Sequence, residues 1–176
     1  MSPELSATCF VGILLMLGAP WGSAQSAAYR DLTMTREGNI DHGRQLFTNY
    51  TCAQCHSLDG SGDKAGPDLS SVGDKFDKAD LIRSIMEPSV TIAVGHDNTL
   101  IRRKDGTTVA GVIRQATSSW IELMPADGKA LRVAIADIES RETSPVSMMP
   151  ENLYLAGTPE DFSDLVTFLG SLRQVA

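Results

Sequence analysis

The sequence predicts a mainly α-helical domain into which a small antiparallel β unit is inserted. Apolar residues recur at helical spacing near residues 39–50 and again near residues 158–172. Between them, residues 95–142 carry two Asp-Gly pairs, each flanked by short apolar runs, which is the pattern of β-hairpins. We therefore expect one helical domain, formed by residues 38–94 and 143–176, and a β unit at residues 95–142.

Three helices are expected in the helical domain. Asn39 or Asp41 caps the first, which runs to about Tyr50 and has Gly43, Leu46, Phe47 and Tyr50 as its core-facing residues. The second covers 79–86 and ends before Pro88. The third begins with Thr158 as cap and Pro159 in its first position, and its inward-facing residues are Phe162, Leu165, Val166, Phe168, Leu169 and Leu172.

The segments between these helices read as one long loop and four strands. Residues 57–76 are rich in Gly, Asp, Ser and Pro, a composition typical of a loop wrapped around something. The first hairpin turns at Asp105-Gly106 and the second at Asp127-Gly128. The expected strands are 99–103, 108–113, 120–124 and 131–135, and the unit has room for a fifth.

The N-terminus predicts an exported protein. Residues 10–19 form an apolar run that is too short to span a bilayer, and Gly22-Ser23-Ala24 offers a cleavage site. We expect a signal peptide at residues 1–24, cleaved near Ala24, and a periplasmic mature protein. The alternative is a retained membrane anchor, since Glu4 and no Lys or Arg precede the apolar run. Residues 25–37 show no clear period and are expected to form a loosely held N-terminal arm.

The charge balance restricts the class of partner. The whole chain has a net charge of −7, and removal of residues 1–24 leaves about −6 because only Glu4 is lost. An acidic protein is poorly suited to nucleic acid or to anionic membrane surfaces. A partner with a basic patch is therefore expected, and membrane contact is expected only if the N-terminal segment is retained.

The run Cys52-Ala53-Gln54-Cys55-His56 predicts covalent attachment of one c-type haem. Two thiols separated by two residues can each add to a vinyl group of one porphyrin, and the residue after the second thiol then lies under the iron. Cys52 and Cys55 are thus the predicted attachment residues, and His56 is the predicted iron ligand.

Three other interpretations of the Cys pair are weaker but stay open. A structural zinc site needs a second pair of ligands at similar spacing, and no cysteine follows Cys55. A thioredoxin-like redox pair is expected near a βαβ pattern, whereas this motif follows a helix. A disulfide between Cys52 and Cys55 would close a very small ring with poor geometry.

A second axial ligand is predicted in the run Ser147-Met148-Met149-Pro150. A thioether in a short loop next to a proline is a plausible ligand for haem iron, which favours Met149 over Met148. His42 and His96 are further candidates, although a lone histidine is more often a surface residue.

These motifs together resemble class I cytochrome c. The resemblance rests on Gly43 and Phe47 in the first helix, Cys52 to His56, the run Gly66-Pro67-Asp68-Leu69, Met149-Pro150, and Leu165 and Phe168 in the last helix. It implies that the first and last helices cross at Gly43, Phe47, Leu165 and Phe168. It also implies that the Pro67 carbonyl accepts a hydrogen bond from Nδ1 of His56, so that Pro67 belongs to the haem site.

A narrower resemblance is to the haem-binding c-type domains of bacteria that are often fused to dehydrogenases. It rests on the runs 81–89, 104–107, 137–142 and 147–151. The long separation of His56 and Met149, 93 positions, is explained by the 48 residues of the β unit between them. The β unit itself is similar to small SH3-like barrels, or to a simple meander, only in its pattern.

The predicted function is that of an electron carrier rather than an enzyme. His/Met ligation suits the transfer of single electrons from a quinoprotein or other dehydrogenase to an oxidase or a second cytochrome. The alternative is an open-site haem protein, peroxidase-like or gas-sensing, in which the β unit displaces the methionine loop. The β unit is either a docking module that exposes Trp120, Arg102 and Arg103, or one whose small core Trp120 fills; we favour the second interpretation.

Overall fold

The structure, a computed structural model, describes residues 21–174. Most of the predicted signal peptide therefore lies outside the described residues, and residues 21–24 form the start of the first helix. The cleavage near Ala24 stays a prediction. Within residues 21–174, none of the helices combines the length and the apolar character needed to cross a membrane.

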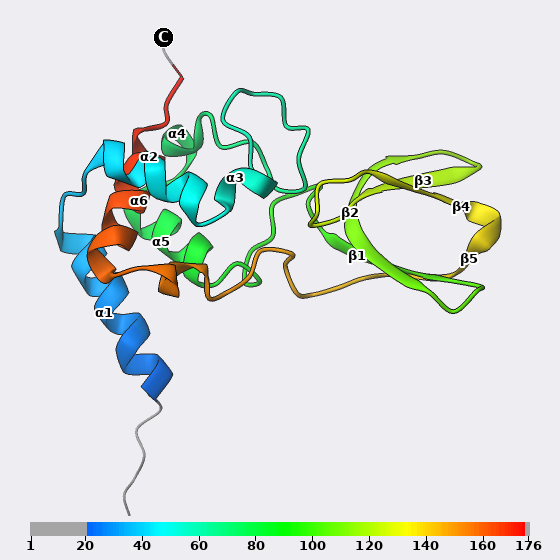
Figure 1. Cartoon of the computed structure of the whole chain (residues 1–176), viewed down its shortest axis with the longest axis horizontal. Coiled ribbons are helices and arrows are strands. Elements are labelled where there is room, and N and C mark those ends of the chain that lie inside the picture. Colours follow the sequence, from blue (N-terminus) through cyan, green and yellow to red (C-terminus); the bar gives the residue numbers. More distant parts are fainter. Residues whose placement is uncertain (1–20, 175–176) are drawn as a thin grey trace, which may run out of the picture.

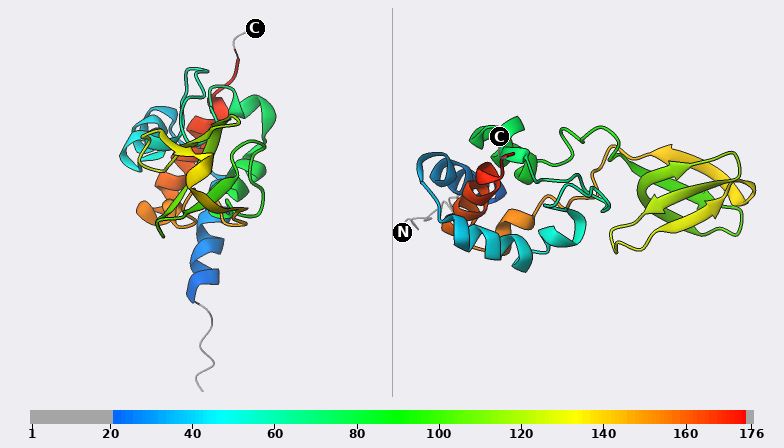
Figure 2. Two further views of the ribbon diagram at one scale, coloured as in Figure 1. Left: turned by 90° about the vertical axis from the view of Figure 1, so that its right-hand side faces the viewer. Right: turned by 90° about the horizontal axis from the view of Figure 1, so that it is seen from above.

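The described chain forms a helical part and a β unit that lie side by side along the long axis of the molecule (Figure 1). The chain enters the β unit after α5 and returns from it before α6 (Figure 2). A five-stranded sheet lies beside six described α-helices, so the fold is a mixture of helix and sheet and the expectation of a mainly α-helical protein is only partly supported. The helices are α1 (Trp21–Thr35), α2 (Ile40–Asn49), α3 (Cys52–Cys55), α4 (Val72–Lys75), α5 (Lys78–Met86) and α6 (Pro159–Ser171).

The expectation of a loosely held arm at residues 25–37 is wrong, because most of this segment lies in α1, which packs on α6. Tyr29 is 6% exposed, and its hydroxyl donates a hydrogen bond to the Gly157 carbonyl at 2.5 Å. Its ring meets those of Tyr154 and Phe162 at centroid distances of 5.2 and 6.1 Å. The buried face of α1 is narrow and includes the polar residue Thr33, which is why no apolar period was visible in the sequence.

Helices α2 and α6 cross in close contact, as the resemblance implies. The Asn39 side chain caps α2 by accepting a hydrogen bond from the His42 amide at 2.9 Å. A Cβ atom at Gly43 would lie only 2.1 Å from the Asp164 carbonyl oxygen, so glycine permits the approach. The rings of Phe47 and Phe168 meet edge-on at 5.9 Å. The predicted contact of Gly43 and Phe47 with Phe168 is confirmed.

One buried carboxylate joins α6 to the start of α2. Asp164 is 5% exposed and accepts hydrogen bonds from Nη1 of Arg36 at 2.5 Å and from the Asn39 amide at 2.8 Å. Nδ1 of His42 lies 2.8 Å from its second oxygen. Burial alone would raise the pKa of Asp164, but its bonds to His42, Arg36 and Asn39 outweigh that effect and lower the pKa. The ionised carboxylate therefore stabilises the helix crossing.

Helix α6 begins where the sequence predicts, with Thr158 as its cap. Thr158 accepts a hydrogen bond from the Asp161 amide, and the Asp161 carboxylate accepts one from the Thr158 amide, which completes a capping box with Pro159 in the first turn. The Asp77 side chain caps α5 by accepting a hydrogen bond from the Asp80 amide at 2.9 Å. The helical core lies between these elements and includes Phe47, Leu81, Ile82, Ile85, Met86, Phe162, Leu165, Val166, Phe168 and Leu169.

The β unit is a single antiparallel sheet with strand order β4-β3-β2-β1-β5. Both predicted hairpins are confirmed: their turns contain Gly106 and Gly128, whose φ angles of +86° and +72° favour glycine. The last strand returns to pair with β1, so the order is a meander of four strands with a fifth at the β1 edge. The strands are β1 (Asn98–Arg103), β2 (Thr108–Ala116), β3 (Trp120–Met124), β4 (Leu131–Ala134) and β5 (Ile138–Thr143).

The interpretation of Trp120 as core filler is wrong. The core of the β unit is made of Ile101, Ile121, Leu123 and Val133. Because side chains alternate along a strand, the inward direction of Ile121 and Leu123 sends Trp120 to the opposite face. There the ring is half-buried under the Arg132 guanidinium, whose central carbon lies 4.2 Å from the ring centroid.

Candidate functional site

The predicted haem-attachment residues form a single helical turn at the end of α2. Helix α2 is followed by Thr51, whose φ of +64° lets the chain turn sharply into α3. The His56 amide donates to the Cys52 carbonyl at 2.9 Å, which closes the turn. Cys52 and Cys55 are both half-buried and are not joined in a disulfide. Burial raises the pKa of the Cys52 thiol to about 11. The two side chains are thus free thiols on one helical turn, where both can react with the same group.

The orientation of His56 leaves one ring nitrogen free. Nδ1 lies 2.8 Å from the Pro67 carbonyl oxygen, and because that oxygen accepts, Nδ1 carries the proton. The lone pair of the neutral ring then lies on Nε2, the nitrogen that can bind a metal. Burial is the main cause that lowers the pKa of His56, and the bond to Pro67 opposes it. The ring is therefore neutral near pH 7, as a ligand must be.

Gly66 allows the imidazole to lie this close to the loop. A Cβ atom at Gly66 would be 2.6 Å from Cε1 of His56 and 2.9 Å from the Cys55 carbonyl oxygen. The Gly66 amide also donates to that same carbonyl at 2.7 Å. The sequence offered Gly66 only as part of a motif, and the structure shows that any larger residue would displace His56.

The loop that carries Pro67 is held together by Asp68. One Asp68 oxygen accepts from the Ser57 hydroxyl at 2.7 Å and from the Gly60 amide at 3.0 Å, and the other accepts from the Ser70 amide at 2.9 Å and the Ser70 hydroxyl. Burial alone would raise the pKa of Asp68, but these hydrogen bonds lower it to about 2. Asp68 thus fixes both ends of the loop around Pro67.

Asp68→Asn should therefore lower the free energy of unfolding near neutral pH but not in strong acid. The folded pKa of about 2 lies below the ordinary value of 3.8, so the ionised group stabilises the fold above about pH 4, and this contribution is lost as the pH falls toward 2. We expect the variant to lose about 1 kcal/mol in the free energy of unfolding at neutral pH. Urea unfolding at about pH 7, 5 and 3 measures the difference.

The matched control for this prediction is Asp63→Asn, which changes an exposed carboxylate of the same loop. We expect this control to unfold like the wild type at every pH. Equal stability of Asp68→Asn and the wild type at neutral pH would contradict the role of Asp68.

Met149 is the better placed of the two candidate methionines. Its amide donates to the Ser147 hydroxyl at 3.1 Å, and the Ser147 amide donates to the Ser89 hydroxyl at 3.2 Å. The Met149 side chain packs against the helical core cluster, and so does Cys52. Met148 is half-buried as well but does not belong to that cluster. Cys52, from the predicted attachment turn, and Met149, the predicted second ligand, therefore pack on the same hydrophobic core.

These donors fit a c-type haem. Two thiols not joined in a disulfide lie on one turn, the adjacent imidazole presents Nε2, and a thioether packs on the same core as Cys52. Cys52, Cys55, His56 and Met149 would hold such a group, and Pro67 would orient the imidazole. The other histidine candidates are engaged elsewhere: His42 contacts Asp164, and His96 contacts the Ala65 carbonyl.

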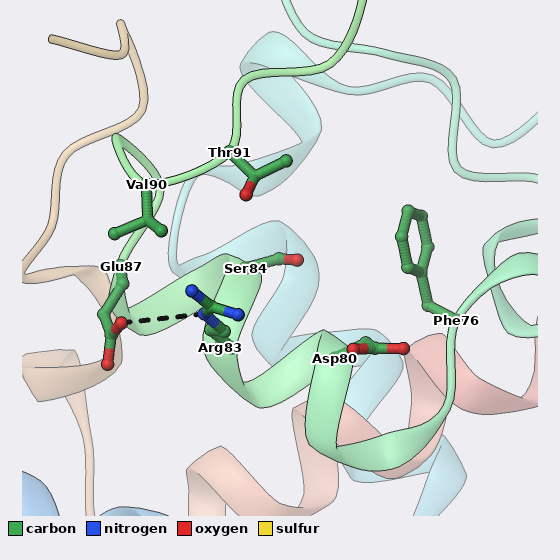
Figure 3. A pocket seen from close by; sticks show the side chains of 7 residues that line it. All are labelled: Phe76, Asp80, Arg83, Ser84, Glu87, Val90 and Thr91. Atoms are coloured by element: carbon green, nitrogen blue, oxygen red, sulfur yellow. Dashed lines mark ion pairs between the residues drawn. The ribbon is translucent and has the colours of Figure 1, made fainter. Parts of the chain in front are cut away.

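A cavity of about 370 Å³ borders His56, between the attachment turn and residues 57–64. The pocket in Figure 3 is smaller, about 110 Å³, and lies along α5, between Phe76 before the helix and the turn that follows it. Its charged side chains are in part paired with each other, since Arg83 and Glu87 are 3.8 Å apart. None of the residues that line it is a predicted haem residue, so we assign it no part in the site.

Sequence reasoning missed three residues that hold this region. Nζ of Lys64 donates to the Ala53 carbonyl and, at 3.3 Å, to the His56 carbonyl. Arg114 on β2 donates to the carbonyls of Gly62 and Lys64. His96 was considered only as an iron ligand, and its ring instead bonds to the loop. A cationic residue in a polar loop or on a strand gives no signal in the sequence for such contacts, because their partners are backbone carbonyls.

Comparison with known protein families gives a match over the central part of the chain. The family model described as Cytochrome c matches residues 40–131, just over half of the 176 residues. The match includes the attachment turn, the Pro67 loop and much of the β unit, and it ends before Met149. No curated protein matches the chain.

Proposed function

We propose, because this chain belongs to the cytochrome c family, that it is an exported monohaem cytochrome which carries single electrons from a dehydrogenase to a terminal acceptor. Members of this family bind covalently attached haem c and function in haem-based electron transfer. We assign the attachment to Cys52 and Cys55 and the axial ligands to His56 and Met149.

The observation that carries this proposal is the orientation of His56. Its Nδ1–H is held by the Pro67 carbonyl at 2.8 Å, which fixes the tautomer and directs Nε2 away from the loop. Such a bond also raises the basicity of the ligating nitrogen. The bound haem would supply an iron that alternates between its ferric and ferrous states.

The anchoring of the methionine loop favours electron transfer over the open-site alternative. Met149 is held by its amide bond to Ser147 and by its contact with the helical core. A thioether fixed in this way supports a six-coordinate iron, which has no vacant position for peroxide or a gas. The protein then serves to hold both ligands, to exclude water and to set the potential.

The absorption spectrum of the oxidised holoprotein tests the proposal. We expect one haem that stays attached after denaturation, together with the methionine-to-iron charge-transfer band. The band should be lost in Met149→Leu and retained in the matched control Met148→Leu. The midpoint potential should fall in Met149→His, since imidazole replaces the thioether.

Two results would overturn the assignment. Persistence of the band in Met149→Leu would exclude Met149 as the ligand. Carbon monoxide binding to the ferrous wild type as fast as to a five-coordinate haem would favour the peroxidase-like or gas-sensing alternative.

The proposed setting is the periplasm, with the signal peptide removed near Ala24. The donor is proposed to be a quinoprotein or other dehydrogenase and the acceptor an oxidase or a second cytochrome. The mature charge of about −6 supports partners that present a basic patch.

A further inference from the structure

Two side chains from outside the helical part reach the loop that follows the haem-attachment turn. Arg114 on β2 donates from Nη1 to the Lys64 carbonyl at 3.2 Å and from Nη2 to the Gly62 carbonyl. His96, which lies two residues before β1, donates from Nδ1 to the Ala65 carbonyl at 3.0 Å. In Figure 1 this loop extends from α3 toward the β unit and meets it at the junction of the two parts.

The same loop is held on its other side by the attachment turn. The Gly66 amide donates to the Cys55 carbonyl at 2.7 Å, and Nζ of Lys64 donates to the Ala53 and His56 carbonyls. Pro67 follows Gly66, and its carbonyl accepts the hydrogen bond from Nδ1 of His56. Residues 62–67 are therefore clamped between the β unit and the turn that carries the imidazole.

We infer that the inserted β unit positions the proximal ligand, with Arg114 and His96 as positioning residues that hold the Pro67 carbonyl against His56. This inference rests on the proposed function, in which His56 binds the haem iron. It gives the β unit a role within the electron-transfer site itself, in place of the docking role considered from the sequence.

Arg114 and His96 can restrain this loop because they donate several hydrogen bonds to neighbouring backbone carbonyls. Arg114 is exposed, so each of its bonds to a carbonyl is weak alone. The Ala65 carbonyl accepts the hydrogen bond from His96. Because Ala65 is only 5% exposed, this bond is shielded from solvent and is stronger than one at the surface. Together the bonds restrain three of the residues just before Gly66 and Pro67, where glycine at 62 and 66 would otherwise leave the backbone free.

The expected electrochemical effect has a defined sign. A strong Nδ1–H···O=C bond makes the imidazole a better electron donor, which favours ferric iron and lowers the midpoint potential. Loosening residues 62–67 weakens that bond. Loss of the Arg114 and His96 donors should therefore raise the midpoint potential.

The test is the double variant Arg114→Met, His96→Phe in the holoprotein, because both replacements keep bulk and remove the donors. We expect amide hydrogen exchange in residues 62–66 to become about fivefold faster or more, and the midpoint potential to rise. Arg102→Met is the matched control, since Arg102 also belongs to the β unit but pairs with Glu139. It should change neither quantity. His96→Asn, which keeps a donor, should partly restore both when combined with Arg114→Met.

Two outcomes would overturn the inference. One is unchanged exchange in residues 62–66, which would mean that Arg114 and His96 do not hold the loop. The other is faster exchange with an unchanged potential, which would mean that the loop does not act on His56. A wild-type protein without attached haem would instead refute the proposed function, and with it the electrochemical part of the inference, while the exchange measurement would still decide whether the loop is held.

Discussion

Gly43→Ala should lower the free energy of unfolding by about 2 kcal/mol. The added Cβ would lie 2.1 Å from the Asp164 carbonyl oxygen and 2.7 Å from Cβ of Phe168, so helices α2 and α6 must separate. Forced separation of a packed crossing costs about 3 kcal/mol, and the better helix propensity of alanine offsets up to about 1 kcal/mol of it. Urea unfolding of the holoprotein, followed by circular dichroism, measures the change.

Gly170→Ala is a matched control on α6. A Cβ atom at Gly170 would meet only Cδ1 of Leu81, at the ordinary contact distance of 3.7 Å. This variant should therefore be as stable as the wild type or up to about 1 kcal/mol more stable, because glycine is costly inside a helix. If both variants were equally stable, the close crossing at Gly43 would not be what holds α2 against α6.

Asp164→Asn should cost about 2 kcal/mol near neutral pH. The substitution keeps the shape of the side chain but removes the negative charge that Arg36, His42 and the Asn39 amide share. Breaking a buried pair by removing one partner is strongly destabilising, and the effect is reduced here because the Arg36 side chain is 34% exposed. The control is Glu139→Gln, which removes one half of the exposed pair with Arg102 and should change stability little.

The pH dependence of this effect has a predictable sign. Because the folded pKa of Asp164 lies below its ordinary value of 3.8, its contribution is present above about pH 4 and is lost as the pH falls through the lower folded value. The stability of Asp164→Asn should therefore fall less steeply in acid than that of the wild type. Parallel acid profiles for the two proteins would contradict a stabilising charge at Asp164.

The elements that sequence analysis predicted well have strong local signals. Thr158 and Pro159 mark the start of α6 through capping chemistry that involves only neighbouring residues. Asp105-Gly106 and Asp127-Gly128 mark both hairpin turns, because each turn needs a residue with positive φ. The match to the cytochrome c family agrees with the resemblance seen in the motifs.

The elements that were predicted wrongly depend on contacts between distant segments. Helix α1 was missed because only a narrow face of it, with Tyr29 and Thr33, is buried. Trp120 was expected in the small core of the β unit, but that core is made of Ile101, Ile121, Leu123 and Val133. In each case the residue type allowed both outcomes, and packing selected one.

The sequence alone determined the Cys-x-x-Cys-His motif, the place of the β unit and the cap of α6, because each depends on residue types at fixed short spacings. Only the tertiary structure decided how these parts act on one another. It brings Pro67 to His56, Asp164 to Arg36 and His42, and Arg114 and His96 to the loop at residues 62–65. Most of these contacts join segments far apart in the chain, and several end on backbone carbonyls, which every residue possesses and no sequence pattern can mark.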